Sequence, residues 1–129
     1  MSNKKRILYV EDEKEMIELT RIVLEREGFD MLGVVGGAKG IEAIRREKPD
    51  LVLLDLMMPD VDGWEVYRQM KADKDLADIP VIIITARTQS IDKVLGLKVA
   101  KVADYITKPF GPGELVESIK RVLAKTDQS

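Results

Sequence analysis

The chain has 129 residues, 45% hydrophobic and 34% charged, and its 21 basic and 23 acidic residues give a formal net charge of −2. This length suits one domain whose core needs no disulfide or metal to hold it together. There is no cysteine and no histidine, which excludes disulfides, thiolate or imidazole metal ligands, a Ser-His-Asp triad and a histidine phosphodonor within the chain. The balanced charge argues against direct binding to nucleic acid. Any chemistry must therefore use carboxylates, lysines, hydroxyls and the backbone.

The amino terminus is basic, but the apolar run behind it, 7–10, stops at Glu11. A signal peptide needs a longer apolar stretch, and a membrane-spanning helix needs about 20 residues. We therefore expect a cytoplasmic protein with no membrane contact. Residues 4–124 are predicted to form the domain, with flexible termini at 1–3 and 125–129.

Apolar patterns of two kinds alternate along the chain. Short apolar runs predict strands over 7–10, 29–35, 51–54, 81–84 and 104–107. Apolar residues at helical spacing predict helices over 13–27, 38–48, 64–72 and 90–101, and a last helix from Pro112. The runs 51–54 and 81–84 are apolar throughout, which indicates strands buried on both faces of a parallel sheet.

Strands that alternate with helices predict an α/β fold. Right-handed crossovers place the five strands in one parallel sheet with helices on both faces, a doubly wound (βα)5 three-layer sandwich. Ligands of such folds bind beyond the carboxyl ends of the strands. The residues at those ends are therefore the candidates for a functional site.

Four of the predicted strands end in charged or hydroxyl side chains. These are Glu11 and Asp12 after the first strand, Asp55 after the third, Thr85 after the fourth and Lys108 after the fifth. The three carboxylates and one lysine bring a charge of about −2 to one rim, and carboxylates this close raise one another's pKa unless a cation compensates them. Ligation by oxygen alone favours Mg²⁺. We therefore expect a magnesium site at this rim.

Asp55 is the best candidate for a nucleophile. It ends an apolar strand that holds it rigidly, and carboxylates form covalent phosphoryl intermediates in proteins. Phosphoryl transfer needs mainly positioning and charge neutralisation. Mg²⁺ and Lys108 can supply the neutralisation, and the Thr85 hydroxyl can donate a hydrogen bond to a phosphoryl oxygen. These residues predict an aspartyl phosphate at Asp55.

Several segments carry a resemblance to a known family. They are 9–13, 49–59 followed by Gly63, 83–86 and 104–110. Together they resemble the response-regulator receiver domain, the phosphoacceptor of two-component signalling. The similarity runs over nearly the whole chain and fits a stand-alone receiver like the chemotaxis regulator. The resemblance implies a flavodoxin-like fold with strand order 2-1-3-4-5.

The resemblance also implies a role for each site residue. Asp55 would accept a phosphoryl group from a histidine of a partner sensor histidine kinase, and Lys108 would contact that group. Asp12 and Asp55 would bind Mg²⁺ directly, Glu11 would bind it largely through water, and Met57 would bind it through its backbone carbonyl. Apart from its own phosphorylation and a slow autodephosphorylation, the domain would not be an enzyme.

Thr85 and Tyr105 would form a switch pair. On phosphorylation the threonine hydroxyl would move toward the phosphoryl group, and the tyrosine ring would turn inward into the space that the hydroxyl leaves. This change would alter the surface formed by the helix 90–101, the strand 104–107 and the helix from Pro112. We expect this surface to bind a downstream protein target or a missing output domain, and to support a monomer or a weak dimer.

The resemblance implies two further local features. The peptide bond between Lys108 and Pro109 would be cis. Met57 and Arg87, each two residues beyond a site residue, would tune the lifetime of the phosphoryl group by controlling the access of water. Neither is an obvious base for an attacking water molecule, so we expect a lifetime of at least minutes.

Three features depart from the common pattern of the family. The acidic pair is Glu11-Asp12 where many members have two aspartates, and the longer glutamate suits a ligand that acts through water. The segment 96–104 is one residue longer than usual, so we expect an unusual shape for this part of the partner-binding surface. Asp60 replaces a common glycine and is expected to affect only a loop.

Several alternatives stay open at this point. The chain could be a receiver fragment of a larger regulator or hybrid kinase, or a phosphorelay intermediate. A flavin-binding electron carrier of the same fold would need a hydroxyl- and glycine-rich phosphate loop where this chain is acidic. An aspartyl-phosphate hydrolase typically has a second aspartate where Met57 stands. A receiver-like scaffold that works unphosphorylated is less consistent with the complete set of site residues.

Overall fold

The computed structural model describes residues 4–86 and 102–128, and in them strands and helices alternate. In chain order the elements are β1 (Arg6–Glu11), α1 (Lys14–Arg26), β2 (Asp30–Val35), α2 (Gly37–Glu47), β3 (Leu51–Asp55), α3 (Gly63–Ala72), β4 (Val81–Ala86), β5 (Asp104–Lys108) and α5 (Pro112–Gln128). The predictions for the terminus 1–3, for Arg87 and for the helix 90–101 lie outside the described residues, as does most of the segment 96–104.

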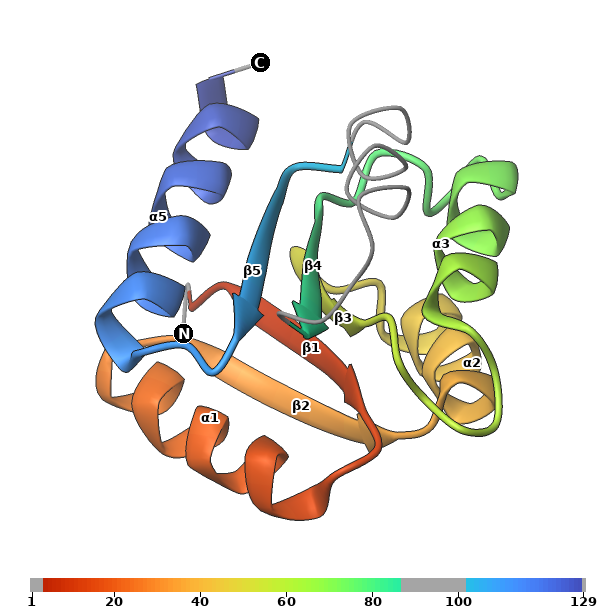
Figure 1. Ribbon diagram of the computed structural model, residues 1–129. Helices are drawn as coiled ribbons and strands as arrows, with labels where there is room; N and C mark the ends of the chain where they lie inside the picture. Colours follow the sequence, from red (N-terminus) through yellow and green to blue (C-terminus); the bar gives the residue numbers. More distant parts are fainter. Residues whose placement is uncertain (1–3, 87–101, 129) are drawn as a thin grey trace.

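The strands form one five-stranded parallel sheet in the order β2-β1-β3-β4-β5, which confirms the predicted flavodoxin-like topology. Val10 pairs with Leu54 in the register of β1 and β3, so the next residues of these strands also lie side by side. Ala86 pairs with Lys108 at the end of β4 and β5. All the strands point toward the same edge of the sheet (Figure 1). This register brings the expected site residues to one edge.

The sheet lies between two layers of helices. Helices α1 and α5 cover one face, and α2 and α3 cover the other (Figure 1). Successive side chains of β1 point to opposite faces, so Tyr9 joins the core under α1 and α5 while Val10 joins the core under α2 and α3. Every residue of β3 is buried, as its continuous apolar pattern predicts. None of the described helices is long and apolar enough to cross a membrane.

The helix ends follow local chemistry, with one exception. Helix α1 ends just before Gly28, whose φ of 88° suits glycine. Helix α3 begins after Asp62, whose side chain accepts a hydrogen bond from the Trp64 N–H at 2.9 Å. Helix α5 continues to Gln128, whereas the sequence predicts a flexible tail from residue 125. The polar stretch 125–128 extends a helix that is anchored by its buried apolar stripe, and the flexibility expected for this terminus stays a prediction.

Candidate functional site

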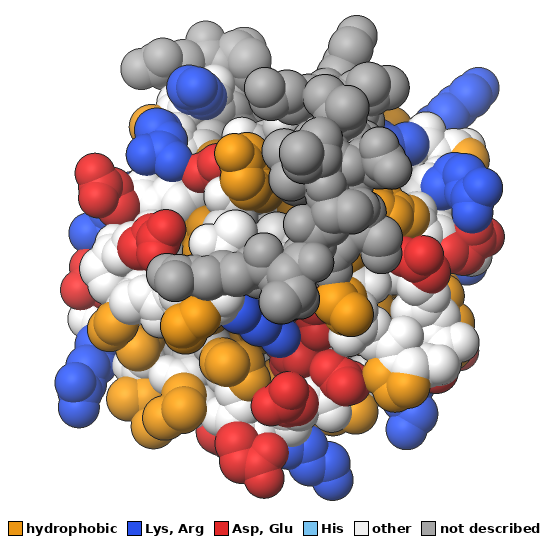
Figure 2. Space-filling model, in the orientation of Figure 1, with side chains coloured by type: hydrophobic (Ala, Val, Ile, Leu, Met, Phe, Trp, Pro, Cys, Tyr) orange, Lys and Arg blue, Asp and Glu red, His pale blue; other side chains and the backbone are white. Residues whose placement is uncertain are grey.

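Three acidic side chains meet where β1 and β3 end. Carboxylate oxygens of Glu11, Asp12 and Asp55 all lie within 4.8 Å of one another. Glu11 is fully buried and Asp55 is 2% exposed, while Asp12 is partly exposed. In Figure 2, acidic side chains gather at the lower centre of the molecule, next to a basic one. The fold therefore assembles the acidic rim that the strand ends predict.

Lys108 reaches this acidic cluster from the end of β5. Its Nζ lies 2.9 Å from Oε2 of Glu11 and 3.4 Å from Oδ2 of Asp55. Burial opposes the positive charge, but the two carboxylates outweigh it and hold the pKa of Lys108 above its ordinary value. The lysine is thus a stable cation that bridges two carboxylates.

The Glu11 carboxylate accepts hydrogen bonds from several donors. Its Oε2 accepts from the Tyr9 hydroxyl at 2.8 Å and from Lys108, and its Oε1 accepts from the Asp12 backbone N–H at 3.1 Å. Burial opposes ionisation, but hydrogen bonds with Asp12, Lys108 and Tyr9 lower the pKa of Glu11. Burial also raises the pKa of Tyr9, so its hydroxyl stays protonated. Glu11 is therefore a fixed, buried anion.

Asp55 has the opposite electrostatic balance. Burial and the neighbouring Glu11 carboxylate raise its pKa, although the Met57 backbone N–H, which donates to Oδ1 at 3.0 Å, and Lys108 oppose the shift. A bound cation would relieve the repulsion between the carboxylates. The cluster therefore suits a divalent ion with oxygen ligands, and Glu11, Asp12 and Asp55 are the residues that could hold it.

Thr85 and Tyr105 lie on the neighbouring strands β4 and β5. The Thr85 side chain is buried, and its hydroxyl donates to the Ala86 carbonyl at 3.4 Å. Tyr105 is 44% exposed. The expected pair thus has its threonine inside the molecule and its tyrosine at the surface. The peptide bond between Lys108 and Pro109 is cis, which is the conformation that the family resemblance implies.

Asp60 ties the loop between β3 and α3 to helix α2. Its carboxylate accepts hydrogen bonds from the backbone N–H groups of Gly37 at 3.1 Å and Ala38 at 3.3 Å, and these bonds lower the pKa of Asp60. The first N–H groups of a helix have no partner within the helix, so a carboxylate there stabilises it. The expectation that Asp60 affects only a loop is therefore wrong, because the residue joins that loop to a helix.

The same loop carries Met57 and ends at Gly63. The Met57 side chain is 54% exposed beside the acidic cluster. A Cβ on Gly63 would collide with the backbone of Asp55 and Leu56. Only glycine therefore allows α3 to begin directly against the strand end that carries Asp55.

One family model covers most of the chain. It is described as the response regulator receiver domain, and it matches residues 7–120. The chain belongs to the response regulator receiver domain family. Response regulators act in two-component signalling, so this receiver is a component of such a system.

Curated relatives of this receiver include longer regulators. The chain is 42% identical over 124 residues to the DNA-binding response regulator MtrA of Mycobacterium tuberculosis, covering 96% of this chain and 53% of that protein. It is 41% identical over 125 residues to the transcriptional regulatory protein CseB of Streptomyces coelicolor, covering 97% of this chain and 52% of that protein. The chain therefore spans about half the length of these relatives.

Solved structures show the same fold. A CheY-like response regulator receiver domain protein from Methanospirillum hungatei superimposes with a TM-score of 0.89 at 28% identity, covering 98% of both chains. The receiver domain of a signal transduction histidine kinase from Syntrophus aciditrophicus gives a TM-score of 0.87 at 32% identity, covering 97% of this chain and 94% of that one. Similar receivers thus occur in regulators and in kinases.

Two residues of this receiver contact the site region without standing at a strand end. Tyr9 lies two positions before Glu11 on β1, so strand periodicity places both side chains on one face and could have suggested their contact. Asp60 bonds to residues 37 and 38 from the following βα unit. No local pattern in the sequence indicates that second contact.

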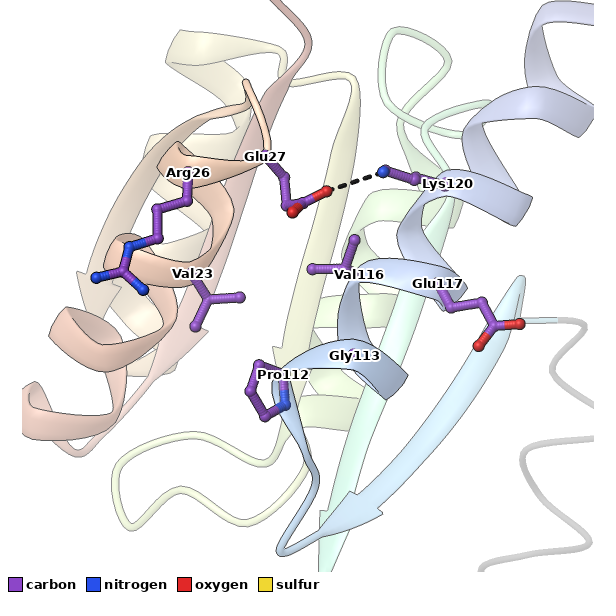
Figure 3. Close-up of a pocket in the computed structure, with 8 residues that line it drawn as sticks. All are labelled: Val23, Arg26, Glu27, Pro112, Gly113, Val116, Glu117 and Lys120. Atoms are coloured by element: carbon purple, nitrogen blue, oxygen red, sulfur yellow. Dashed lines mark hydrogen bonds and ion pairs between the residues drawn. The ribbon is translucent and has the colours of Figure 1, made fainter.

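A groove away from the acidic cluster lies between α1 and α5 and has a volume of about 470 Å³. Figure 3 shows Val23 and Val116 facing each other across it, with an ion pair of 2.8 Å between Glu27 and Lys120 at one end. Its lining combines apolar side chains with charges of both signs. The lining therefore does not favour any one class of ligand. The ion pair at its end links α1 and α5, two helices of the same layer.

Proposed function

We propose that this receiver accepts a phosphoryl group on Asp55 from a histidine of a partner sensor histidine kinase, in a reaction that requires Mg²⁺. One observation carries the proposal. The buried Asp55 carboxylate lies beside two further carboxylates, and the Lys108 ammonium group bridges it to Glu11. The chain contains no histidine, so the phosphodonor is another molecule.

The donor set fits a magnesium ion. Glu11, Asp12 and Asp55 would hold it, together with the backbone carbonyl of Met57, and Lys108 leaves a charge of about −2 for a divalent ion to balance. When bound, the ion supplies charge neutralisation for the transferring phosphoryl oxygens. The raised pKa of Asp55 supports the need for this cation.

The residues of the chain provide the remaining chemistry. A carboxylate oxygen of Asp55 forms the new P–O bond while the P–N bond to the donor histidine breaks and its electron pair returns to the imidazole. The Lys108 ammonium group neutralises phosphoryl oxygens, and the Thr85 hydroxyl donates a hydrogen bond to one of them. Met57 is apolar and Arg87 is a cation, so neither is an obvious base for an attacking water molecule, which supports a phosphoryl lifetime of at least minutes.

An apolar groove beside the acidic cluster suits contact with the donor protein. It has a volume of about 330 Å³ and lies between α1 and the start of α5, with Leu19, Ile22 and Phe110 among its lining residues. Leu19 is 62% exposed and Ile22 is 50% exposed. Figure 2 shows hydrophobic side chains gathered at the lower left of the molecule, next to the acidic side chains at the lower centre. A donor that seats on this groove would present its histidine to Asp55.

The output of the receiver is a change of surface. Thr85 moves toward the phosphoryl group and Tyr105 turns inward, which alters the face formed by β5, α5 and the expected helix 90–101. This face binds a downstream protein or an output domain and supports a monomer or a weak dimer.

Relatives named as DNA-binding and transcriptional regulators favour an output domain. A place in a phosphorelay or a hybrid kinase is the second candidate, favoured by the similar receiver of a histidine kinase. Either role belongs in the cytoplasm.

Beryllofluoride, which mimics an aspartyl phosphate, tests the proposal through Trp64. This tryptophan is partly buried in the first turn of α3, next to the loop that leaves Asp55. We expect beryllofluoride with Mg²⁺ to change its fluorescence, and we expect no change in EDTA or in the Asp55→Asn variant. An unresponsive native protein, or an equal response in the variant, would overturn the proposal.

A further inference from the structure

Tyr9 is a buried polar residue that the proposed chemistry does not use. It lies at the centre of the sheet on β1, between Gly33 of β2 and Leu53 of β3, and its side chain is 0% exposed. Its ring packs in the apolar core under α1 and α5. A phenylalanine would fill this apolar space equally well, so the hydroxyl group needs a separate explanation.

The hydroxyl points to the edge of the acidic cluster. It donates to Oε2 of Glu11 at 2.8 Å, and the same oxygen accepts from Lys108 at 2.9 Å. Lys108 in turn lies 3.4 Å from Oδ2 of Asp55. In residues 4–86 and 102–128, every buried side-chain nitrogen or oxygen has a hydrogen-bond partner. Tyr9 is therefore the core end of a chain of contacts that reaches Asp55 through Glu11 and Lys108.

We propose that Tyr9 is a positioning residue of the acidic site, whose hydroxyl holds the Glu11 carboxylate in the place from which it acts on Lys108 and on the bound cation. This inference rests on the proposed function for the identity of the cation. The hydroxyl itself touches neither the cation nor the phosphoryl group. Without the Tyr9 hydroxyl, the Glu11 carboxylate can shift toward Lys108. It then no longer lies at the distance from Asp12 and Asp55 that the cation needs.

The length of Glu11 makes this contact possible. Aspartate is shorter by one carbon–carbon bond, about 1.5 Å, which would carry its carboxylate beyond hydrogen-bond reach of a hydroxyl now 2.8 Å away. Tyr9 and Glu11 therefore form a matched pair. The Glu11→Asp variant keeps an acidic residue at this position and removes the coupling to Tyr9, and its effect on the Lys108 contact is common to both variants that carry it.

Calorimetric titration with Mg²⁺ of the wild type, Tyr9→Phe, Glu11→Asp and the double variant tests the proposal. Loss of one hydrogen bond to a charged group should raise the Kd of Tyr9→Phe by about tenfold relative to the wild type. In the Glu11→Asp background the same change should raise the Kd by less than about twofold. An unchanged Kd in Tyr9→Phe, or an equal rise in both backgrounds, would overturn the proposal.

A control variant separates positioning from loss of stability. Ile119→Val removes one methyl group from the same apolar core, so it should lower the urea midpoint and leave the Kd for Mg²⁺ unchanged. A rise in Kd equal to that of Tyr9→Phe would assign the effect to the core and not to the hydroxyl.

Unfolding in urea with EDTA gives a readout that needs no metal. Tyr9→Phe should lower the midpoint in the wild-type background and leave it unchanged in the Glu11→Asp background. Equal shifts in both would overturn the pairing of Tyr9 with Glu11. A wild type that binds no Mg²⁺ would contradict the proposed function, and this unfolding comparison would then decide the role of Tyr9 alone.

Discussion

At Asp55, burial and a neighbouring carboxylate act against ionisation, while one lysine favours it. The pKa of Asp55 is raised and that of Glu11 is lowered, although both side chains are buried at the same edge of the sheet. The difference arises from their neighbours, because hydrogen bonds with Asp12, Lys108 and Tyr9 favour the Glu11 anion, and Lys108 lies nearer to Glu11 than to Asp55. The anion that forms first is thus Glu11, and Asp55 is the carboxyl group that gains most from an added cation.

This balance predicts that Asp55→Asn stabilises the metal-free protein. Folding raises the pKa of Asp55 from about 4 in the unfolded chain to about 7, so the folded state favours the protonated carboxyl group. As the pH rises through this range, Asp55 ionises and the free energy of unfolding falls. One pKa unit corresponds to about 1.4 kcal/mol, so we expect a gain above about 1 kcal/mol at pH 7.5. At pH 4 the gain should disappear.

Thermal unfolding in EDTA and in Mg²⁺ measures this effect. The variant should have the higher Tm in EDTA at neutral pH, and Mg²⁺ should raise the Tm of the wild type more than that of the variant. A variant that is less stable than the wild type at neutral pH in EDTA would show that Asp55 is stabilising as an anion.

At the scale of elements, the loop from Asp55 to α3 is held at both ends. Gly63 lets α3 begin against the backbone of Asp55, and Asp60 bonds to the first turn of α2. Gly36, which precedes α2 with a φ of 93°, donates its N–H to the Glu11 carbonyl at 3.1 Å. The start of α2 therefore connects the strand of Glu11 with the loop of Asp55.

We expect Asp60→Ala to lower the free energy of unfolding by about 1 kcal/mol, the usual cost of removing a capping side chain from a helix. Asp60 has a lowered pKa, so its contribution is present above its unfolded pKa of about 4 and is lost as the pH falls through the folded value. Urea unfolding at pH 7 and pH 3 measures both effects. The exposed Asp78→Ala is the control, and equal losses in the two variants would contradict the capping role.

The elements themselves could largely be predicted from the sequence, because strands and helices bury apolar faces with different periods. The apolar run of β3 is buried as its pattern predicts, and α1 lies within the predicted range 13–27. The sequence does not indicate that α5 continues to Gln128, because the polar stretch after Ala124 extends a helix whose stability comes from earlier turns. The Asp60 contact could not be predicted, since it joins segments 23 residues apart through the tertiary fold.

The acidic site shows the same division between local pattern and tertiary contact. Positions at the ends of parallel strands were enough to predict that Glu11, Asp12 and Asp55 meet. These positions were not enough to predict which hydrogen-bond donor contacts each carboxylate oxygen. In the sequence Tyr9 looks like an ordinary core residue of an apolar strand. Its role differs from that of the apolar side chains around it only because its hydroxyl contacts Glu11.

At the scale of the whole molecule, the acidic residues are balanced in number by basic ones but are not evenly placed. Three carboxylates converge on one edge of a sheet that two helical layers otherwise bury. The fold thus concentrates negative charge at the edge where we propose that a cation and a phosphoryl group bind, and the family match assigns the domain to two-component signalling. The central claim is that Asp55 is the phosphoacceptor.

Intact-protein mass spectrometry after incubation with acetyl phosphate and Mg²⁺ tests this claim most directly. We expect the mass of one phosphoryl group on the wild type, none in EDTA and none on Asp55→Asn, with loss of the group over minutes or longer once the donor is removed. A wild type that gains no mass, or an Asp55→Asn variant that gains the same mass, would contradict the account.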